Sequence, residues 1–276
     1  MRRIFWLLVA LAACDQKKSP PPPSVPPQTL PTGMSEEQFA DLHTLRPDEP
    51  SRLTGKDVLV GGSRAYLSLP ANAAPGMPAV IVIHEWWGLN DHIRHAADRL
   101  AGLGMAALAV DLYGGNVAST REQAQTYVKS VDPKIATATL KAAADYLKDE
   151  PTIKARRRGV IGWCFGGTWS LQTALAVKDL DAAVVYYGFM PTDETELKGL
   201  KAPLLAFFGT KDQAIPIASV DAFEATLKKL GKEATIERVD AAHAFANPSS
   251  QNYDSEAAKA AWAKTQTFLN GKLGSN

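Results

Sequence analysis

The chain has 276 residues, of which 46% are hydrophobic and 21% charged, the composition of an ordinary globular protein with one large domain or two small ones. The 30 basic and 29 acidic residues give a formal net charge of +1, which argues against nucleic acid as a partner. With only two cysteines, Cys14 and Cys164, a framework of several disulfides is excluded.

The N-terminal segment is typical of an export signal. Met1-Arg2-Arg3 precedes an apolar run over residues 4–13, and Leu-Ala-Ala-Cys at 11–14 resembles the lipobox of bacterial lipoproteins. A membrane span would need about 20 apolar residues. We predict a signal peptide over residues 1–13, lipid attachment at Cys14, and export to a membrane surface facing the periplasm. An ordinary cleaved signal and an uncleaved anchor are the alternatives.

A proline-rich stretch follows Cys14 and includes four consecutive prolines, at residues 20–23. Such a stretch favours extended polyproline II and cannot pack a hydrophobic core. Residues 14–33 are therefore predicted to be a tether, and the folded domain is predicted over residues 34–276.

Beyond the tether, short apolar runs alternate with helical stretches, which predicts one doubly wound α/β domain with a mostly parallel sheet and helices on both faces. Gly61-Gly62 favours a hairpin between an early pair of strands, at 57–60 and 63–69. Later strands are expected at 79–84, 106–111, 159–162, 182–187, 203–208 and 235–239. Helices are expected at 91–103, 134–147, 168–177, 220–230 and 254–269.

Cys164 lies in a segment with the pattern of a nucleophile elbow, Gly162-Trp-Cys164-Phe-Gly166, between an expected strand and an expected helix. A nucleophile on such a tight turn needs small residues two positions to either side, because a β-carbon there would collide with the crossing backbone. The turn also directs the Phe165 N–H toward the position of an oxyanion. The alternative is a buried structural cysteine. The glycine pattern favours a catalytic cysteine.

In hydrolases with this elbow an acid and then a histidine follow the nucleophile, each after a later strand. Asp212 follows the apolar run 203–208, and His243 follows the strand expected at 235–239. His243 would exchange protons with the thiol and the leaving group, and Asp212 would orient the imidazole. A surface-turn aspartate and a loop histidine with a purely structural role are the alternatives.

Taken together, these motifs resemble the dienelactone hydrolase family, a branch of the α/β-hydrolase superfamily, over residues 53–269. The segments that carry the resemblance are His-Glu-Trp-Trp-Gly-Leu at 84–89, Asp-Leu-Tyr-Gly at 111–114, the Cys164 elbow, and the loops with Asp212 and His243. The resemblance implies that Glu85 contacts the resting thiol and takes its proton, and that the Trp86 backbone N–H is the second oxyanion donor.

A functional role for Glu85 is also indicated by its position, independently of the resemblance. A carboxylate at the end of a buried strand beside two tryptophans should have a raised pKa. A structural hydrogen bond to a neighbouring loop is the alternative. His84 and Glu85 lack the second histidine of a zinc helix motif, and no metal or other cofactor is expected. His92 and His95 are interpreted as surface residues.

The sequence departs from the family where arginines hold the substrate carboxylate. After the strand expected at 106–111, the chain reads Gly114-Gly115-Asn116, with no arginine. The position four residues beyond His243 is Asn247. Without a guanidinium fork, a bidentate grip on a carboxylate is not expected there. Pocket candidates are Asn247 and four aromatic residues near the strand ends, each of which could equally be core packing: Trp86, Trp87, Tyr113 and Phe165. Trp163, a fifth aromatic residue of this group, sits inside the elbow and is expected to be buried.

These observations predict a hydrolase that cleaves the ester, lactone or thioester bonds of small molecules through Cys164, with no cofactor, and a monomer is favoured. The alternative is a lipoprotein that keeps the hydrolase fold as a binding or scaffold module without catalysis. A reactive Cys164 distinguishes the two, since a binding module has no need of one.

Overall fold

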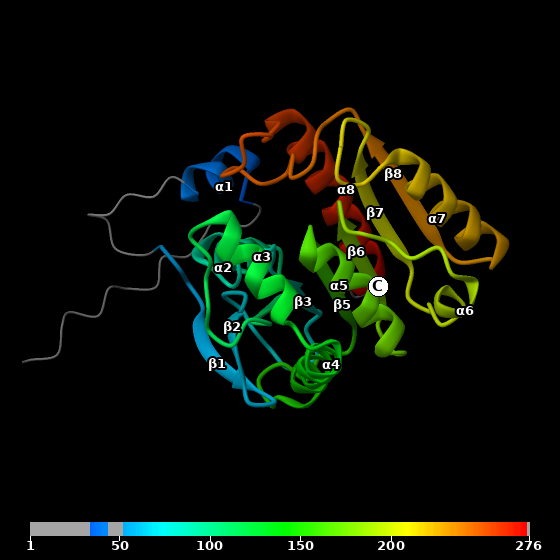
Figure 1. Cartoon of the computed structure of the whole chain (residues 1–276). Helices are drawn as coiled ribbons and strands as arrows, with labels where there is room; N and C mark the ends of the chain where they lie inside the picture. Colours follow the sequence, from blue (N-terminus) through cyan, green and yellow to red (C-terminus); the bar gives the residue numbers. More distant parts are fainter. Residues whose placement is uncertain (1–33, 44–51, 275–276) are drawn as a thin grey trace, which may run out of the picture.

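The structure is a computed structural model that describes residues 34–43 and 52–274. The predicted signal peptide, the lipid attachment at Cys14 and the tether over residues 14–33 lie outside the described residues. Figure 1 shows a twisted central sheet with helices packed along it. The sheet has eight strands in the order β1-β2-β4-β3-β5-β6-β7-β8.

The first two strands form an antiparallel hairpin, β2 also pairs antiparallel with β4, and the remaining strands run parallel to one another. The strands are β1 (Lys56–Val60), β2 (Ser63–Ser68), β3 (Ala79–Ile83), β4 (Ala106–Val110), β5 (Arg158–Trp163), β6 (Ala182–Tyr186), β7 (Leu204–Gly209) and β8 (Ala234–Val239).

Helices cover both faces of the sheet. On one face α4 packs against α5, and on the other α1 bridges α2 and α8. The helices are α1 (Glu36–Leu42), α2 (Asp91–Ala101), α3 (Arg121–Ser130), α4 (Pro133–Asp149), α5 (Phe165–Ala176), α6 (Glu194–Leu197), α7 (Ile217–Lys229) and α8 (Ser255–Leu273).

The central strands are apolar, apart from Arg158 at the start of β5, because both of their faces are covered. Every residue of β3, β4, β5, β6 and β7 is buried, whereas β1 at one edge and β8 at the other are largely accessible. Parallel strands place their carboxyl ends along one edge of the sheet, and ligands of such sheets bind there. Every predicted catalytic residue follows the carboxyl end of a parallel strand.

The predicted sheet and its hairpin are confirmed, with strand ends displaced by one residue at most. The predicted helix at 168–177 is wrong at its start, because α5 begins at Phe165, immediately after the cysteine. Glycines at 166 and 167 concealed these first helical residues, since glycine is a poor helix former. No pattern in the sequence predicts α1, α3 or α6, which are short or strongly polar.

The interpretation of both His92 and His95 as surface residues is wrong. The imidazole of His95 is buried and that of His92 is half-buried. The cause is α1, which packs over this face of α2 and places His43 in a stack on His92. Without α1, the polar face of α2 that contains these histidines would be exposed to solvent. The sequence pattern of α2 alone therefore predicts surface positions for them.

No helix among residues 34–43 and 52–274 combines the length and the hydropathy that a membrane crossing requires.

Candidate active site

The Cys164 elbow is a strained turn between β5 and α5. The cysteine has φ 53° and ψ −116°, in a region that side chains other than glycine rarely adopt, and it serves as the residue before the first turn of α5. Such a conformation costs on the order of 1–3 kcal/mol and persists only where the surroundings enforce it. The turn leaves the Cys164 side chain half-buried at the N-terminal end of a helix.

The flanking glycines enforce the turn, as the sequence pattern predicted. A β-carbon on Gly162 would collide with the carbonyl of Gly166, and a β-carbon on Gly166 would collide with the carbonyl of Ile83 at the end of β3. Because Gly166 contacts the end of β3 this closely, the start of α5 lies directly beside the segment after β3 that contains Glu85.

A continuous chain of hydrogen bonds joins the three predicted catalytic side chains. His243 Nε2 lies 3.2 Å from Cys164 Sγ, and His243 Nδ1 lies 2.7 Å from Asp212 Oδ2. The other Asp212 oxygen accepts the backbone N–H groups of Ala214 at 2.8 Å and Ile215 at 3.0 Å. Asp212 is thereby fixed in the loop after β7, and it orients the imidazole toward the sulfur.

The charges in this chain favour a protonated imidazole. Burial alone would lower the pKa of His243, but its hydrogen bonds to Asp212 and Cys164 and their negative charges raise it to about 10. Burial alone would raise the pKa of Asp212, but its hydrogen bonds from His243 and the loop amides hold it below its usual value. At neutral pH the imidazole beside the sulfur is therefore protonated.

Glu85 lies behind this chain and is buried, with 6% of its surface exposed. Burial raises the pKa of Glu85 from its ordinary 4.5 to about 7, although the charge of His243 and two hydrogen bonds act in the opposite direction. The raised pKa that the sequence predicted is therefore present, and the carboxyl group changes its charge near neutral pH.

The partners of Glu85 differ from those that the family resemblance implied. One carboxylate oxygen accepts the Tyr187 hydroxyl at 3.3 Å, and the other accepts the side-chain amide of Asn247. The thiol of Cys164 instead has its hydrogen bond with His243. The predicted contact between Glu85 and the resting thiol is thus replaced in this structure by a hydrogen-bonded cluster around the carboxylate.

Asn247 occupies the position where the family has an arginine, and its amide is directed at Glu85 rather than offered to a substrate. Its Nδ2 donates to Glu85, and its Oδ1 accepts the Ser249 backbone N–H at 2.9 Å. The amide of Asn247 therefore orients Glu85. Both ends of this amide are engaged in hydrogen bonds within the protein.

His84 is a structural residue with both ring nitrogens in hydrogen bonds. Its Nε2 accepts the Leu112 backbone N–H at 3.1 Å, so Nδ1 carries the proton and donates to the Glu85 carbonyl at 2.6 Å. Burial lowers the pKa of His84, which keeps the ring neutral. The ring thus joins the ends of β3 and β4, and it holds the backbone of Glu85 in place.

Aromatic side chains gather just beyond the ends of β3, β4 and β5. The ring of Tyr113 lies 5.4 Å from that of Phe165, and its hydroxyl donates to the Trp86 carbonyl at 3.2 Å. Trp86 and Trp87 form an edge-to-face pair at 5.0 Å and are both half-buried. Trp163 instead faces the core beside Tyr186.

The two predicted oxyanion donors, the backbone N–H groups of Phe165 and Trp86, follow the ends of β5 and β3. Within the described part of the chain, neither N–H donates a hydrogen bond to another protein group. Phe165 is the first residue of α5, so its N–H belongs to the positive end of that helix.

Tyr187 is the residue of this site that the sequence reasoning missed. Its backbone has φ 38°, its side chain is fully buried, and its ring lies 5.1 Å from that of His243 while its hydroxyl donates to Glu85. The one available signal was a tyrosine followed by glycine at the end of an apolar strand, where a buried hydroxyl needs a partner.

Comparison with known proteins agrees with this geometry. The model of the dienelactone hydrolase family matches residues 63–273. The protein usf of Aquifex pyrophilus is 32% identical over 220 residues, which cover 75% of this chain and 92% of that protein. Carboxymethylenebutenolidase 1 of Cupriavidus pinatubonensis is 28% identical over 215 residues, which cover 74% of this chain and 90% of that protein.

A solved structure described as m3DLH aligns with a TM-score of 0.73 and 26% sequence identity, and the alignment covers 79% of this chain and 98% of that one. The fold, the matched residues and the relatives agree with one another. The chain belongs to the dienelactone hydrolase family, within the α/β-hydrolase superfamily, and is a hydrolase of the carboxymethylenebutenolidase type.

Proposed function

We propose that this hydrolase cleaves ester, lactone or thioester bonds of small molecules with Cys164 as the nucleophile, His243 as the general acid and base, and Asp212 as the residue that orients the imidazole. The observation that carries the proposal is the unbroken chain of hydrogen bonds from Cys164 Sγ through His243 to Asp212, at a strained turn before a helix.

In the acylation step the Cys164 thiolate attacks the carbonyl carbon, and the carbonyl oxygen takes up negative charge. The backbone N–H groups of Phe165 and Trp86 stabilise this oxyanion. The protonated His243 then gives its proton to the leaving alkoxide or thiolate as the carbon–oxygen or carbon–sulfur bond breaks, so that the alcohol or thiol departs neutral. An acyl group on Cys164 and a neutral imidazole result.

In the deacylation step the neutral His243 removes a proton from water as the water oxygen attacks the acyl carbon. Collapse of the second tetrahedral intermediate breaks the carbon–sulfur bond, frees the carboxylic acid and restores the thiolate beside a protonated imidazole. No group beyond the protein and water is needed for the atoms and charges to balance.

We assign Glu85 an electrostatic role in place of direct contact with the thiol. Its carboxylate is bound by Asn247 and Tyr187, and its charge interacts with that of His243. When Glu85 is ionised, its negative charge stabilises the imidazolium that faces Cys164. Because the pKa of Glu85 is about 7, this support increases as the pH rises through neutrality.

The proposed substrates carry an uncharged, apolar or aromatic acyl group. Tyr113 packs against Phe165, the residue after Cys164, and its hydroxyl donates to the Trp86 carbonyl. The amide of Asn247, by contrast, is used to hold Glu85. Aromatic surfaces favour apolar groups, whereas a substrate carboxylate would need a guanidinium fork. An Asn247→Arg variant should therefore raise kcat/KM for a carboxylate-bearing ester about tenfold relative to its methylated analogue.

We further propose that the protein is exported and attached to a membrane through lipid at Cys14, with residues 14–33 as a tether, and that it acts on the periplasmic side. The lipobox-like residues 11–14 support this proposal. Mass spectrometry of the N-terminal peptide from the full-length protein tests it. Acylation at Cys14 that is lost in Cys14→Ser would support the anchor, and an unmodified thiol would contradict it.

The catalytic proposal is tested by the hydrolysis of short p-nitrophenyl esters by the protein that begins at Asp15. Wild-type protein, Cys164→Ala and iodoacetamide-treated wild type are compared. Turnover that both treatments abolish would support a thiol hydrolase. Turnover that is indifferent to both would remove Cys164 as the nucleophile, and a thiol that resists alkylation in an inactive protein would favour a binding module.

A further inference from the structure

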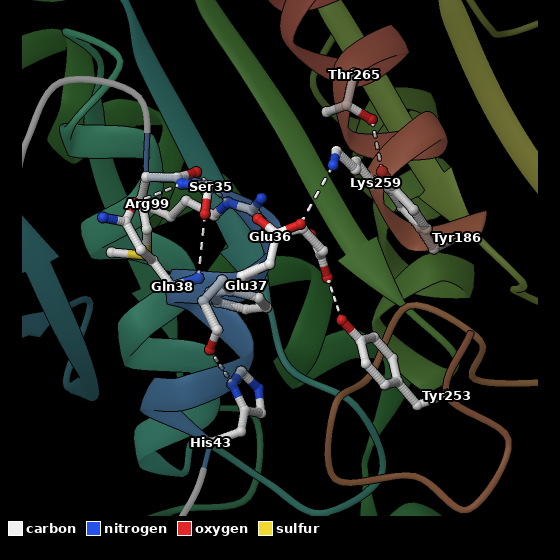
Figure 2. Close-up of polar contacts among 12 residues, drawn as sticks. Ser35, Glu36, Glu37, Gln38, His43, Arg99, Tyr186, Tyr253, Lys259 and Thr265 are labelled. Atoms are coloured by element: carbon white, nitrogen blue, oxygen red, sulfur yellow. Dashed lines mark hydrogen bonds and ion pairs between the residues drawn. The ribbon is translucent and has the colours of Figure 1, made fainter. Parts of the chain in front are cut away.

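The short helix α1 lies outside the residues that the family model matches, 63–273, and yet it is firmly packed on the domain. Ser35 begins it with a reciprocal capping box with Gln38. Phe39 and Leu42 are buried in the core. Figure 2 shows that polar side chains of this helix are directed at α8 and at the chain segment that contains Tyr253. Helix α1 is therefore an addition to the matched domain that is held on it by both apolar and polar contacts.

A buried ion pair fixes α1 to the domain. Glu36 Oε2 accepts a hydrogen bond from Arg99 at 2.9 Å, and both side chains are at least 96% buried. The guanidinium lies over the ring of Phe39 at 4.6 Å and over the ring of Trp262 at 4.1 Å. Arg99 therefore joins α1, α2 and α8, and removing Glu36 would leave a buried, unpaired cation.

The second oxygen of Glu36 reaches the loop that carries the catalytic histidine. We define the catalytic-histidine loop as residues 240–254, between β8 and α8. Glu36 Oε1 accepts the Tyr253 hydroxyl at 3.0 Å (Figure 2). Next to Tyr253, the side-chain amide of Asn252 donates to the His243 carbonyl at 3.0 Å. The carboxylate of Glu36 is thus connected to the backbone of His243 through two adjacent residues of the loop, Tyr253 and Asn252.

A second contact between α1 and this loop passes through two stacked imidazoles. The ring of His43 lies 4.1 Å from that of His92, at an angle of 26°. His92 Nδ1 lies 3.0 Å from Ser249 Oγ, and the Ser249 backbone N–H donates to Asn247 Oδ1 at 2.9 Å. Because the same Asn247 donates to Glu85, this path ends at the carboxylate behind the site.

A small cavity separates α1 from Glu85. Its volume is about 40 Å³, and its wall includes Glu36, Phe39 and His43 on one side and Glu85 and Asn247 on the other. A space of that size holds only about two or three water molecules. Helix α1 and the residues behind the active site therefore line the same small cavity. A displacement of α1 would change the packing around Asn247.

We propose that α1 is a positioning element of the active site, which fastens the catalytic-histidine loop at Tyr253 and at Ser249 and so orients His243 and Asn247. This inference rests on the proposed function of Cys164 and His243. It assigns a role in catalysis to a segment that touches neither substrate nor nucleophile, and it makes Glu36 and Tyr253 the residues through which that segment acts.

The test uses Tyr253→Phe combined with Ser249→Ala, which removes both contacts with the loop and leaves the buried Glu36–Arg99 pair intact. Glu37→Gln is the matched control, because Glu37 is the next residue of α1 and pairs at the surface with Lys259 of α8, at 3.2 Å. Glu36→Gln, which breaks the anchor itself, is the stronger perturbation. For each protein, kcat, KM and the pH profile are measured per active site, counted by alkylation of Cys164.

We expect the double variant to lower kcat about tenfold with KM within about twofold of wild type, since a misplaced His243 weakens the chemical step more than binding. The acid inflection of its pH profile should move upward, because the Asn247 hydrogen bond that lowers the pKa of Glu85 is weakened. Glu37→Gln should match wild type.

A double variant with wild-type kcat and pH profile would overturn the inference, as would equal losses in Glu37→Gln. A loss confined to the number of active sites would also overturn it, since α1 would then serve folding alone. These outcomes differ from failure of the proposed function itself, in which wild-type protein would turn over without any dependence on Cys164.

Discussion

The two sides of the active site are built in different ways. The Cys164 side is local, since Gly162, Cys164 and Gly166 lie within five residues of sequence and the glycines alone make the turn possible. The Glu85 side is assembled from distant segments, because its partners Tyr187 and Asn247 are 102 and 162 residues away. A local pattern specifies the turn that carries the proposed nucleophile, whereas the carboxylate behind it depends on tertiary packing.

The largest effect is expected on the local side, from Cys164→Ala. We expect kcat/KM for a p-nitrophenyl ester to fall about ten-thousandfold, because no other group of the site can form the acyl intermediate. Stopped-flow or long-time-course assays measure the loss, and urea unfolding checks that the fold persists. Cys164→Ser keeps a weaker nucleophile, so its kcat/KM should lie between those of wild type and Cys164→Ala. Equal activity of all three proteins would place the nucleophile elsewhere.

The next effect is expected at Asp212, which belongs to a different loop but completes the same chain of hydrogen bonds. Asp212→Asn should lower kcat about a hundredfold to a thousandfold, because it removes the charge that holds His243 protonated and correctly oriented. Asp240→Asn is the control, since Asp240 lies nearby at the surface in a salt bridge with Lys211. A loss of the same size in both variants would indicate general damage to the loops.

On the distant side, Glu85 should impose a dependence of stability on pH. Its pKa is raised from 4.5 to about 7 in the folded protein, so the folded state binds a proton between these values that the unfolded state has lost. The contribution of Glu85 to the free energy of unfolding should therefore fall by on the order of 3 kcal/mol as the pH rises through this range, and it is fully present below the range.

Urea unfolding of wild type and Glu85→Gln at several pH values between about 4 and 8 isolates this contribution as the difference between the two proteins. The difference is needed because buried histidines such as His43, whose pKa burial lowers to about 3, titrate in the same range with the opposite sign. The same variant should also remove the rise of kcat/KM near pH 7, while leaving the fall that accompanies deprotonation of His243 at about 10. An unchanged dependence of stability on pH in Glu85→Gln would contradict the raised pKa of Glu85.

The sequence predicted those parts of the molecule that short-range patterns determine. The apolar strands, the Gly61-Gly62 hairpin and the elbow depend on neighbouring residues, and each was found within a residue of its predicted place. The order of Asp212 and His243 after the elbow could be predicted because each follows the end of a strand in the same sheet.

The remaining features arise from contacts that no local pattern carries. Helix α1 has only seven residues, and its burial depends on Glu36 meeting Arg99 across 63 positions of sequence. The same packing buries His95, which a helix pattern alone placed at the surface. Asn247 looked like a missing arginine, and only the folded structure shows its amide on Glu85.

The smallest effect is expected from Asn247→Ala, which sharpens the contrast between the two sides. Loss of its hydrogen bond should raise the pKa of Glu85 further above 7 and shift the acid inflection of kcat/KM upward, with kcat at high pH reduced only about threefold. The pH profile of the ester assay measures the shift. An inflection that stays in place would mean that Asn247 does not control Glu85.

The most direct test of the account is to trap the acyl intermediate. Full-length protein is mixed with a p-nitrophenyl ester, quenched in acid within the first turnover, digested and analysed by mass spectrometry. The account predicts one acyl group on the peptide that contains Cys164, absent in Cys164→Ala and formed more slowly in Asp212→Asn. An acyl group on another residue, or rapid p-nitrophenol release by Cys164→Ala, would contradict it.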